Sequence, residues 1–94
     1  MTRRPVKAHA PDLWALTGEL VLVTWEDSHQ FAGWHTDEPA AEPLRCHSAG
    51  RLVRVTGTAV VVAGHWTEEA PAQRSGEMTI PRSAIRAVEV LRWG

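Results

Sequence analysis

Tryptophan and arginine are the residue types in this chain best suited to bind a ligand, and it has five of the former and nine of the latter. An indole ring can stack on a base or a sugar, and the planar fork of arginine fits a phosphate. Trp34 and Trp66 each end an apolar run next to a histidine, where a strand is expected to give way to a loop. Trp25 shares a strand face with Val21 and Val23 and is expected to belong to the core. Ring stacking is therefore predicted at Trp34 or Trp66.

Catalytic motifs are weak. Asp27, Ser28 and His29 are the residue types of a hydrolase triad. However, neighbouring side chains on an extended strand point apart, whereas a triad is assembled from distant segments. The sequence has no paired carboxylates in an acid–base motif and no glycine-rich phosphate loop. The chain is therefore predicted not to be an enzyme.

Metal-ligand residue types occur without a metal-binding spacing. The histidines and the cysteine form no C-x-x-C or H-x3-H motif, and the cysteine is expected to act as a small buried hydrophobe. The residues concerned are His29, His35, Cys46, His47 and His65. The sequence therefore predicts no metal and no cofactor.

Length and composition predict one small cytoplasmic domain. The 94 residues are 44% hydrophobic and include a single cysteine, so the chain can form one core but no disulfide framework. No run approaches the roughly 18 apolar residues of a membrane span. The basic N-terminus lacks the apolar segment of a secretory signal. The expected location is the cytoplasm, or the host cytoplasm if a phage encodes the protein.

Charge is divided unevenly along the chain. Residues 1–43 hold seven acids and three bases, whereas residues 44–94 hold four acids and seven bases, for a net charge of −1. The preference for arginine suits phosphate binding, but the codon bias of a GC-rich genome is the favoured explanation. A general nucleic-acid binder would be more basic.

Strand signals dominate after residue 19. Residues 1–11 are expected to form a loose arm, and Asp12 to cap a helical turn over residues 13–16. Residues 35–47 contain two prolines and several acids, and are expected to form an excursion that could lid a site. The expected strands are 20–25 (continued by 30–34 around Gly33), 51–55, 59–66, 77–80 and 85–91, with turns at 56–58 and 81–84. This pattern predicts an all-β fold: an N-terminal arm over residues 1–19, then a small SH3/Sm-like barrel of about five strongly bent antiparallel strands over residues 20–94.

The expected strands are apolar on both faces. Residues 20–23 and 60–62 do not alternate, as a strand solvated on one face would. A chain this short has little with which to cover a second face, so self-association as a ring or dimer is predicted. The expected contact joins residues 59–66 or 77–80 to the final strand of a neighbour.

The second half of the chain resembles the Sm/LSm-like barrel. Gly50, Leu52 and the run Val60 to Val62 match the first motif of that family, a glycine-containing strand, a tight turn and an apolar return strand. The second motif, a short strand, a basic turn and an apolar last strand, is matched by Ile80, Arg82, Ile85 and Val88. Three features depart from the family: Thr56-Gly57-Thr58 replaces an acid and an asparagine, Ser83 replaces a glycine, and residues 35–47 have no counterpart. The resemblance thus implies the fold more directly than it implies RNA binding.

A wider stretch, residues 20–91, is similar to a group of small, mostly uncharacterised phage and bacterial proteins. The similarity lies in a W-x-D…G-W segment before a C-x-S-x-G strand, here Trp25 to Asp27, Gly33-Trp34 and Cys46 to Gly50. It implies a phage protein that sequesters a host nucleotide signal as an anti-defence sponge.

Arg82 is the residue predicted to matter most for binding. Pro81 fixes one backbone dihedral, and Ile80 and Ile85 are expected to anchor both ends of the turn, so that the arginine projects from a rigid base. The alternative is a surface ion pair with Glu77 or Glu89.

Two functions therefore remain open. The first is an oligomeric, non-enzymatic Sm-like barrel that binds a nucleotide-type ligand, either short RNA or a nucleotide signal. Its predicted ligand-binding residues are Arg82 on phosphate, Ser83 as a hydrogen-bond donor, Trp34 or Trp66 as stacking rings, and His65 and Arg54 beside them. The second is an assembly or protein-interaction module with no small ligand.

Overall fold

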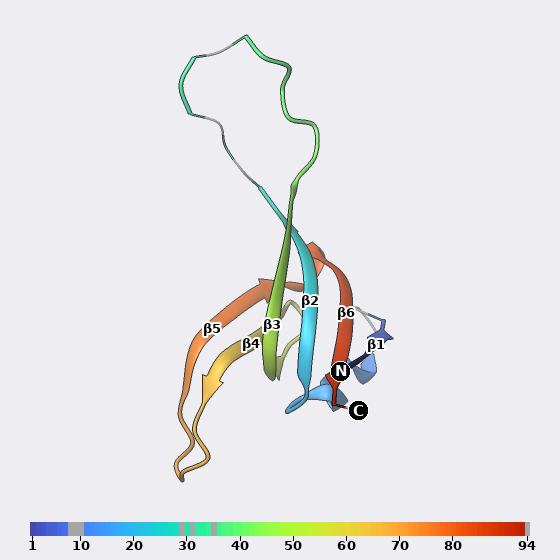
Figure 1. Ribbon diagram of the computed structural model, residues 1–94, viewed down its shortest axis with the longest axis vertical. Helices are drawn as coiled ribbons and strands as arrows, with labels where there is room; N and C mark the ends of the chain where they lie inside the picture. The colour runs from blue at the N-terminus through green and yellow to red at the C-terminus, as the bar shows by residue number, and fades with distance from the viewer. Residues whose placement is uncertain (8–10, 29, 31, 35, 94) are drawn as a thin grey trace.

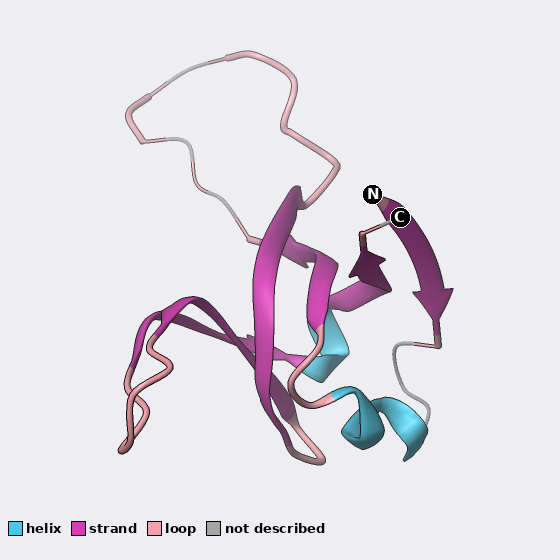
Figure 2. Cartoon of the chain, turned by 60° about the horizontal axis from the view of Figure 1, so that its bottom comes forward, coloured by secondary structure: helices cyan, strands magenta, loops and turns pink. Residues whose placement is uncertain are grey.

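The computed structural model describes residues 1–7, 11–28, 30, 32–34 and 36–93, which form one six-stranded antiparallel sheet (Figure 1). The strand order is β1-β6-β2-β3-β4-β5. The strands are β1 (Thr2–Val6), β2 (Leu20–Asp27), β3 (Leu44–Val55), β4 (Ala59–Trp66), β5 (Arg74–Pro81) and β6 (Ile85–Arg92). Two 3-10 turns, η1 (Pro11–Leu16) and η2 (Arg82–Ala84), lie beside the strands (Figure 2). The expectation of an all-β fold with short turns in place of long helices is confirmed.

The sheet is strongly bent but open. In sheet order β6 and β5 are four strand spacings apart, which is about 19 Å in a flat sheet. Along the chain only the three residues of η2 join them, and such a turn rises about 2 Å per residue. The sheet must therefore curl so that the end of β5 approaches the start of β6. β1 and β5 nevertheless remain its two edges.

The concave side of the bent sheet holds the core. Inward-facing residues of β2, β3, β4 and β6 form it together with Ile80 of β5, and η1 adds Leu13, which is 1% exposed. The other large, fully buried side chains are Leu52, Ile80, Ile85, Val21, Val23, Val60 and Val90. Trp25 packs against this cluster, as expected. On the opposite face of β2, Leu20 and Leu22 are only half-buried.

Gly50 lies where β3 passes close to β4. A Cβ atom at this position would overlap the Ala63 carbonyl oxygen and come within 2.9 Å of Val62 Cγ1. A side chain here would force the two strands apart, so the bend at this point requires glycine.

The N-terminal segment differs from its expectation. Residues 2–6 are not a loose arm but form β1, which pairs with β6 from Thr2↔Arg92 to Val6↔Val88. The short sequence TRRPV carries no alternating apolar pattern, so the local sequence does not predict a strand here. Its strand conformation comes from pairing with β6. The helical turn expected over residues 13–16 is present within η1. The side chain of Asp12 lies outside the described residues, and the capping prediction with it.

The β2–β3 connection also differs. Gln30 and residues 32–34 are not a strand, and β3 begins at Leu44, so the excursion ends at residue 43, four residues earlier than expected. The connecting loop projects beyond the sheet (Figure 1) and lengthens the molecule, whose extents are 55 × 29 × 27 Å.

Candidate ligand-binding groove

Arg82 is buried in the fold instead of projecting from it. It is only 7% exposed, and its backbone N–H donates to the Thr58 carbonyl oxygen at 2.8 Å. Its Nη1 donates to the Thr56 carbonyl oxygen at 2.9 Å, and its guanidinium lies 4.9 Å from the ring centre of Trp14. Arg82 thus fastens η2 to the β3–β4 turn and to η1.

The alternative surface ion pair of Arg82 is not formed either. Glu89 binds Arg3, and Glu77 lies 3.5 Å from Arg74. Neighbouring Ser83 is exposed, and its carbonyl oxygen accepts a hydrogen bond from Arg86 Nη1 at 2.9 Å.

The other predicted binding residues are scattered. Trp34 is fully exposed in the β2–β3 loop, and Arg54 is exposed near the end of β3, opposite Val61. Only His65 and Trp66, at the end of β4, lie together, and Trp66 is 40% exposed. The structure therefore does not bring the six predicted residues into one site.

A groove lies beside the loop end of the β4–β5 hairpin. Its volume is about 300 Å³. The groove lies between the η1–β2 turn, β3 and the hairpin, and is lined by Thr17, Gly18, Arg51, Leu52, Val53, Trp66, Thr67, Ala72, Gln73 and Arg74. A second hollow of about 150 Å³ shares its hairpin wall and adds His65 and Ser75.

Backbone hydrogen bonds hold both walls of the groove. Gly18 N–H donates to the Leu52 carbonyl oxygen at 2.7 Å, and Leu52 N–H donates to the Glu19 carbonyl oxygen at 2.9 Å. On the hairpin side, Thr67 N–H donates to the Gln73 carbonyl oxygen at 3.0 Å, and Gln73 N–H donates to Thr67 Oγ1 at 2.9 Å. Gly18 has φ +97°, a backbone conformation that favours glycine. The walls are therefore preformed.

The groove offers a ring and two cations. The guanidinium of Arg51 lies 5.6 Å from the ring centre of Trp66, within cation–π range. Arg74, opposite Trp66 in the β4–β5 pairing, supplies the second positive charge, and its Nε also lies 3.5 Å from Glu77 Oε1, outside the groove lining. No carboxylate is among the described groove residues, and Arg51 makes no ion pair with the part of the chain that is described. This arrangement suits a planar, anionic molecule.

Sequence reasoning found Trp66 but missed Arg51 and Arg74. Arg51 and Trp66 are fifteen residues apart, but a hairpin with its turn at residues 56–58 pairs Arg51 with Ala63. Counting back from that turn would have placed the arginine near Trp66. The approach of the η1–β2 turn has no comparable signal.

The metal-ligand residue types remain dispersed within the described ranges. Among the residues that the structure describes, no three histidine, cysteine or acidic side chains gather as a metal site. His47 Nδ1 lies 3.1 Å from Thr24 Oγ1, and Cys46 is half-buried, with its thiol 3.7 Å from the Leu44 carbonyl oxygen. His29 and His35 lie outside the described residues. No helix in the described ranges is long and apolar enough to span a membrane.

Comparison with known proteins does not identify a family for this chain. Neither the protein-family models, nor the curated proteins, nor the solved structures contain a match to this chain. The groove formed by Arg51, Trp66 and Arg74 is therefore the feature from which its function has to be argued.

Proposed function

We propose that the protein is a self-associating, non-enzymatic binding protein of Sm-like fold that takes a nucleotide-type ligand in the groove between Arg51, Trp66 and Arg74. The observation that carries the proposal is the arginine–tryptophan pair, 5.6 Å apart, in a preformed groove without carboxylates. The base stacks on Trp66, and the phosphates lie against the two arginines.

Size and chemistry both favour a small nucleotide. A volume of about 300 Å³ is at the lower end of small-molecule sites, which range from about 300 to 1,000 Å³. Stacking of one base on an aromatic ring contributes about 1–3 kcal/mol, and a hydrogen bond to a charged group about 1.5–3 kcal/mol. One base with its phosphates fills the groove, and the smaller hollow beside His65 extends the site to a second unit.

Three features of the chain support the Sm-like part of the proposal. Strands β2 to β6 form a strongly bent sheet in which β6 lies beside β2. Gly50 occupies the close approach of two strands, and Arg82 begins a 3-10 turn between β5 and β6. These positions carry the two motifs of the sequence resemblance. Together with the phage resemblance, they favour sequestration of a nucleotide signal over general RNA binding.

The second candidate function, an assembly module, has its own supporting observation. β5 is an edge strand without a partner on its outer side within the described residues, and its Met78 is 45% exposed. Such an edge can pair with another chain whether or not the groove holds a ligand.

Arg51→Ala tests the proposed site. We expect affinity for a fluorescent nucleotide to fall about 10- to 100-fold, because a charge-assisted hydrogen bond of about 1.5–3 kcal/mol is lost. Arg45→Ala is the control, since Arg45 is another arginine of β3 that is exposed and lies outside the groove. Mass spectrometry of material released from the denatured protein identifies a copurified ligand. Equal affinity of Arg51→Ala, Trp66→Ala and the control would refute the site.

A further inference from the structure

The two sides of β6 are both occupied within the chain. One side pairs with β2 and the other with β1 over Val88 to Arg92. β4 is likewise an interior strand between β3 and β5. The contact expected from the sequence, residues 59–66 or 77–80 of one copy against the final strand of the next, therefore finds most of that final strand already covered.

Side chains hold β1 in place. Arg3 Nε donates to Glu89 Oε2 at 2.9 Å, and Arg3 Nη2 donates to Glu89 Oε1 at 2.7 Å, so the two residues form a bidentate ion pair. Thr2 Oγ1 donates to the Arg92 carbonyl oxygen at 3.4 Å, and Val6 packs against the core. β1 thus covers the β6 edge through polar contacts at one end and an apolar contact at the other.

The outer side of β1 is poorly suited to further pairing. A proline is tolerated in an edge strand where its nitrogen faces away from the ladder. Pro5, which pairs with Glu89 of β6, has no backbone N–H to offer to another strand. Arg3 and Arg4 add positive charge, which also discourages pairing between edges.

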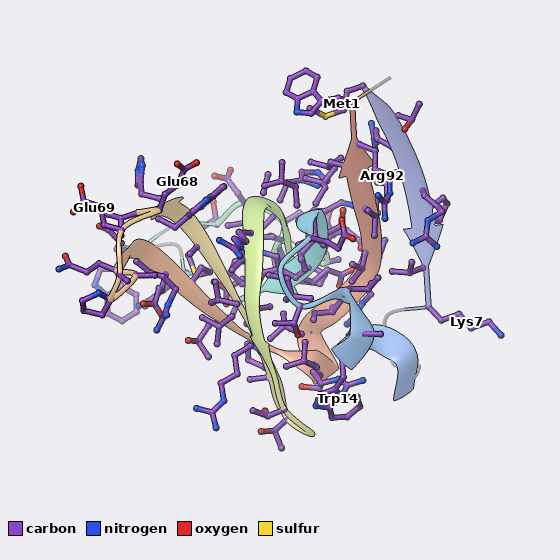
Figure 3. The ribbon with its side chains drawn as sticks, turned by 90° about the horizontal axis from the view of Figure 1, so that it is seen from below. Met1, Lys7, Trp14, Glu68, Glu69 and Arg92 are labelled. Carbon is purple, nitrogen blue, oxygen red and sulfur yellow. The ribbon has the colours of Figure 1, made fainter. Side chains whose placement is uncertain are left out.

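The β5 edge lies on the other side of the molecule and has no such protection. In Figure 3 the tip of the β4–β5 hairpin, with Glu68 and Glu69, lies far from β1. β5 has no proline before its last residue, Pro81, and its outer side is unpaired within the described residues. Its exposed apolar side chain, Met78, lies near the middle of the strand.

We infer that β1 covers the β6 edge so that two copies of the chain join only through β5, side by side and antiparallel, as a closed twofold dimer. A β5-to-β6 contact would be head-to-tail and would continue into a ring or filament, whereas a β5-to-β5 contact uses the same patch twice and stops at two. The inference deepens the self-association in the proposed function and does not depend on the ligand in the groove.

The sequence of β5 fits a twofold axis at Met78. In this register Met78 meets Met78 of the second copy, and Glu77 lies opposite Thr79, so no like charges face each other. A register centred on Glu77 would instead oppose two carboxylates.

Light scattering of the full chain tests the dimer. The expected mass is twice the 10.4 kDa of one chain, and Met78→Lys should return a monomer because two ammonium groups would meet at the axis. Leu44→Lys, the same change at an exposed apolar residue away from β5, should remain a dimer. A monomeric wild type would overturn self-association and this inference together. A dimeric Met78→Lys would overturn only the β5 contact, and nucleotide binding by the groove is measured separately in each case.

A double variant, Arg3→Glu with Val6→Asp, tests the role of β1. It places two carboxylates opposite each other at Glu89 and a charge in the apolar contact, so β1 should detach and species larger than the dimer should appear. Arg4→Glu with wild-type Val6 is the control, because Arg4 is exposed and makes no ion pair within the described residues. Hydrogen exchange of Val88 to Arg92 reports the detachment. Lost protection with a mass that stays at the dimer, or protection that survives both substitutions, would overturn the covering role.

Discussion

Two arginine–tryptophan pairs of similar geometry occupy different regions of this molecule. The guanidinium of Arg82 lies 4.9 Å from the ring of Trp14, and that of Arg51 lies 5.6 Å from the ring of Trp66. Arg82 is 7% exposed and donates a hydrogen bond to a backbone carbonyl, whereas Arg51 is half-buried and lines a groove. The same contact therefore fastens the fold in one place and leaves a cation open to a ligand in the other.

The difference shows that residue type and a rigid backbone do not by themselves make an anion site. Arg82 has the rigid turn that the sequence predicted, with Pro81 before it at φ −59°. However, that turn faces the β3–β4 turn and η1, whose carbonyl group and ring occupy the guanidinium. Arg51 has no unusual turn, but no carboxylate among the residues that the structure describes forms an ion pair with it. What surrounds the cation decides which role it takes.

Arg82→Ala should have the largest effect, and on stability. It removes a hydrogen bond from a charged donor to the Thr56 carbonyl oxygen and the contact with Trp14, for an expected loss of about 2–3 kcal/mol in the free energy of unfolding. For a chain of this size the melting temperature should fall by about 10 °C or more. Thermal unfolding followed by circular dichroism measures it.

The matched control is Arg54→Ala, an exposed arginine near the end of β3, which should change the free energy of unfolding by less than about 0.5 kcal/mol. An unchanged melting temperature in Arg82→Ala, with nucleotide affinity lost, would reverse the comparison. It would return the phosphate site to the η2 turn, as the sequence alone suggested.

The strands that contain their own signal were predicted well. The expected β4 matches the structure residue for residue, because its apolar run lies between a tight turn and a polar loop. The turn at residues 81–84 and the final strand from Ile85 were likewise visible in the pattern of proline, small residues and β-branched side chains. These elements were predictable because local propensity and final structure agree.

The elements that depend on distant partners were not predicted from the sequence. β1 exists only through its pairing with β6, and the groove exists only because the η1–β2 turn reaches β3 and the hairpin. Neither leaves a periodic trace in the sequence. The burial of Arg82 was not predicted for the same reason, since the carbonyl group and the ring that its guanidinium contacts lie 26 and 68 residues away in the chain.

Replacing residues 36–41 by a short glycine–serine linker should have a smaller effect. The β2–β3 loop projects beyond the sheet and adds no residue to the core, and each doubling of loop length changes stability by only about 0.6 kcal/mol. The loop follows the end of β2 at Asp27, whereas the groove adjoins the start of β2 at Gly18. Nucleotide affinity should therefore persist, contrary to the lid that the sequence suggested. Calorimetric titration measures it, and a lost affinity would show that the loop reaches the site.

The smallest expected effect is a pH dependence of the free energy of unfolding that comes from Glu89, the residue that pairs with Arg3 of β1. Hydrogen bonds from Arg3, together with its positive charge, hold the pKa of the Glu89 carboxyl below its ordinary value of 4.5. Its stabilising contribution is therefore fully present above the pKa of the unfolded chain and is lost as the pH falls through the lower pKa of the folded protein. Because the ion pair is at the surface, salt should weaken the effect.

Urea unfolding between pH 6 and pH 3 should show that wild type loses more stability than Glu89→Gln, which keeps the shape of the side chain but has no carboxylate to protonate. Glu77→Gln removes the partner of Arg74 at the other edge and is the control for a general loss of charge. Parallel pH profiles for wild type and Glu89→Gln would mean that the Arg3–Glu89 pair does not hold β1 in solution.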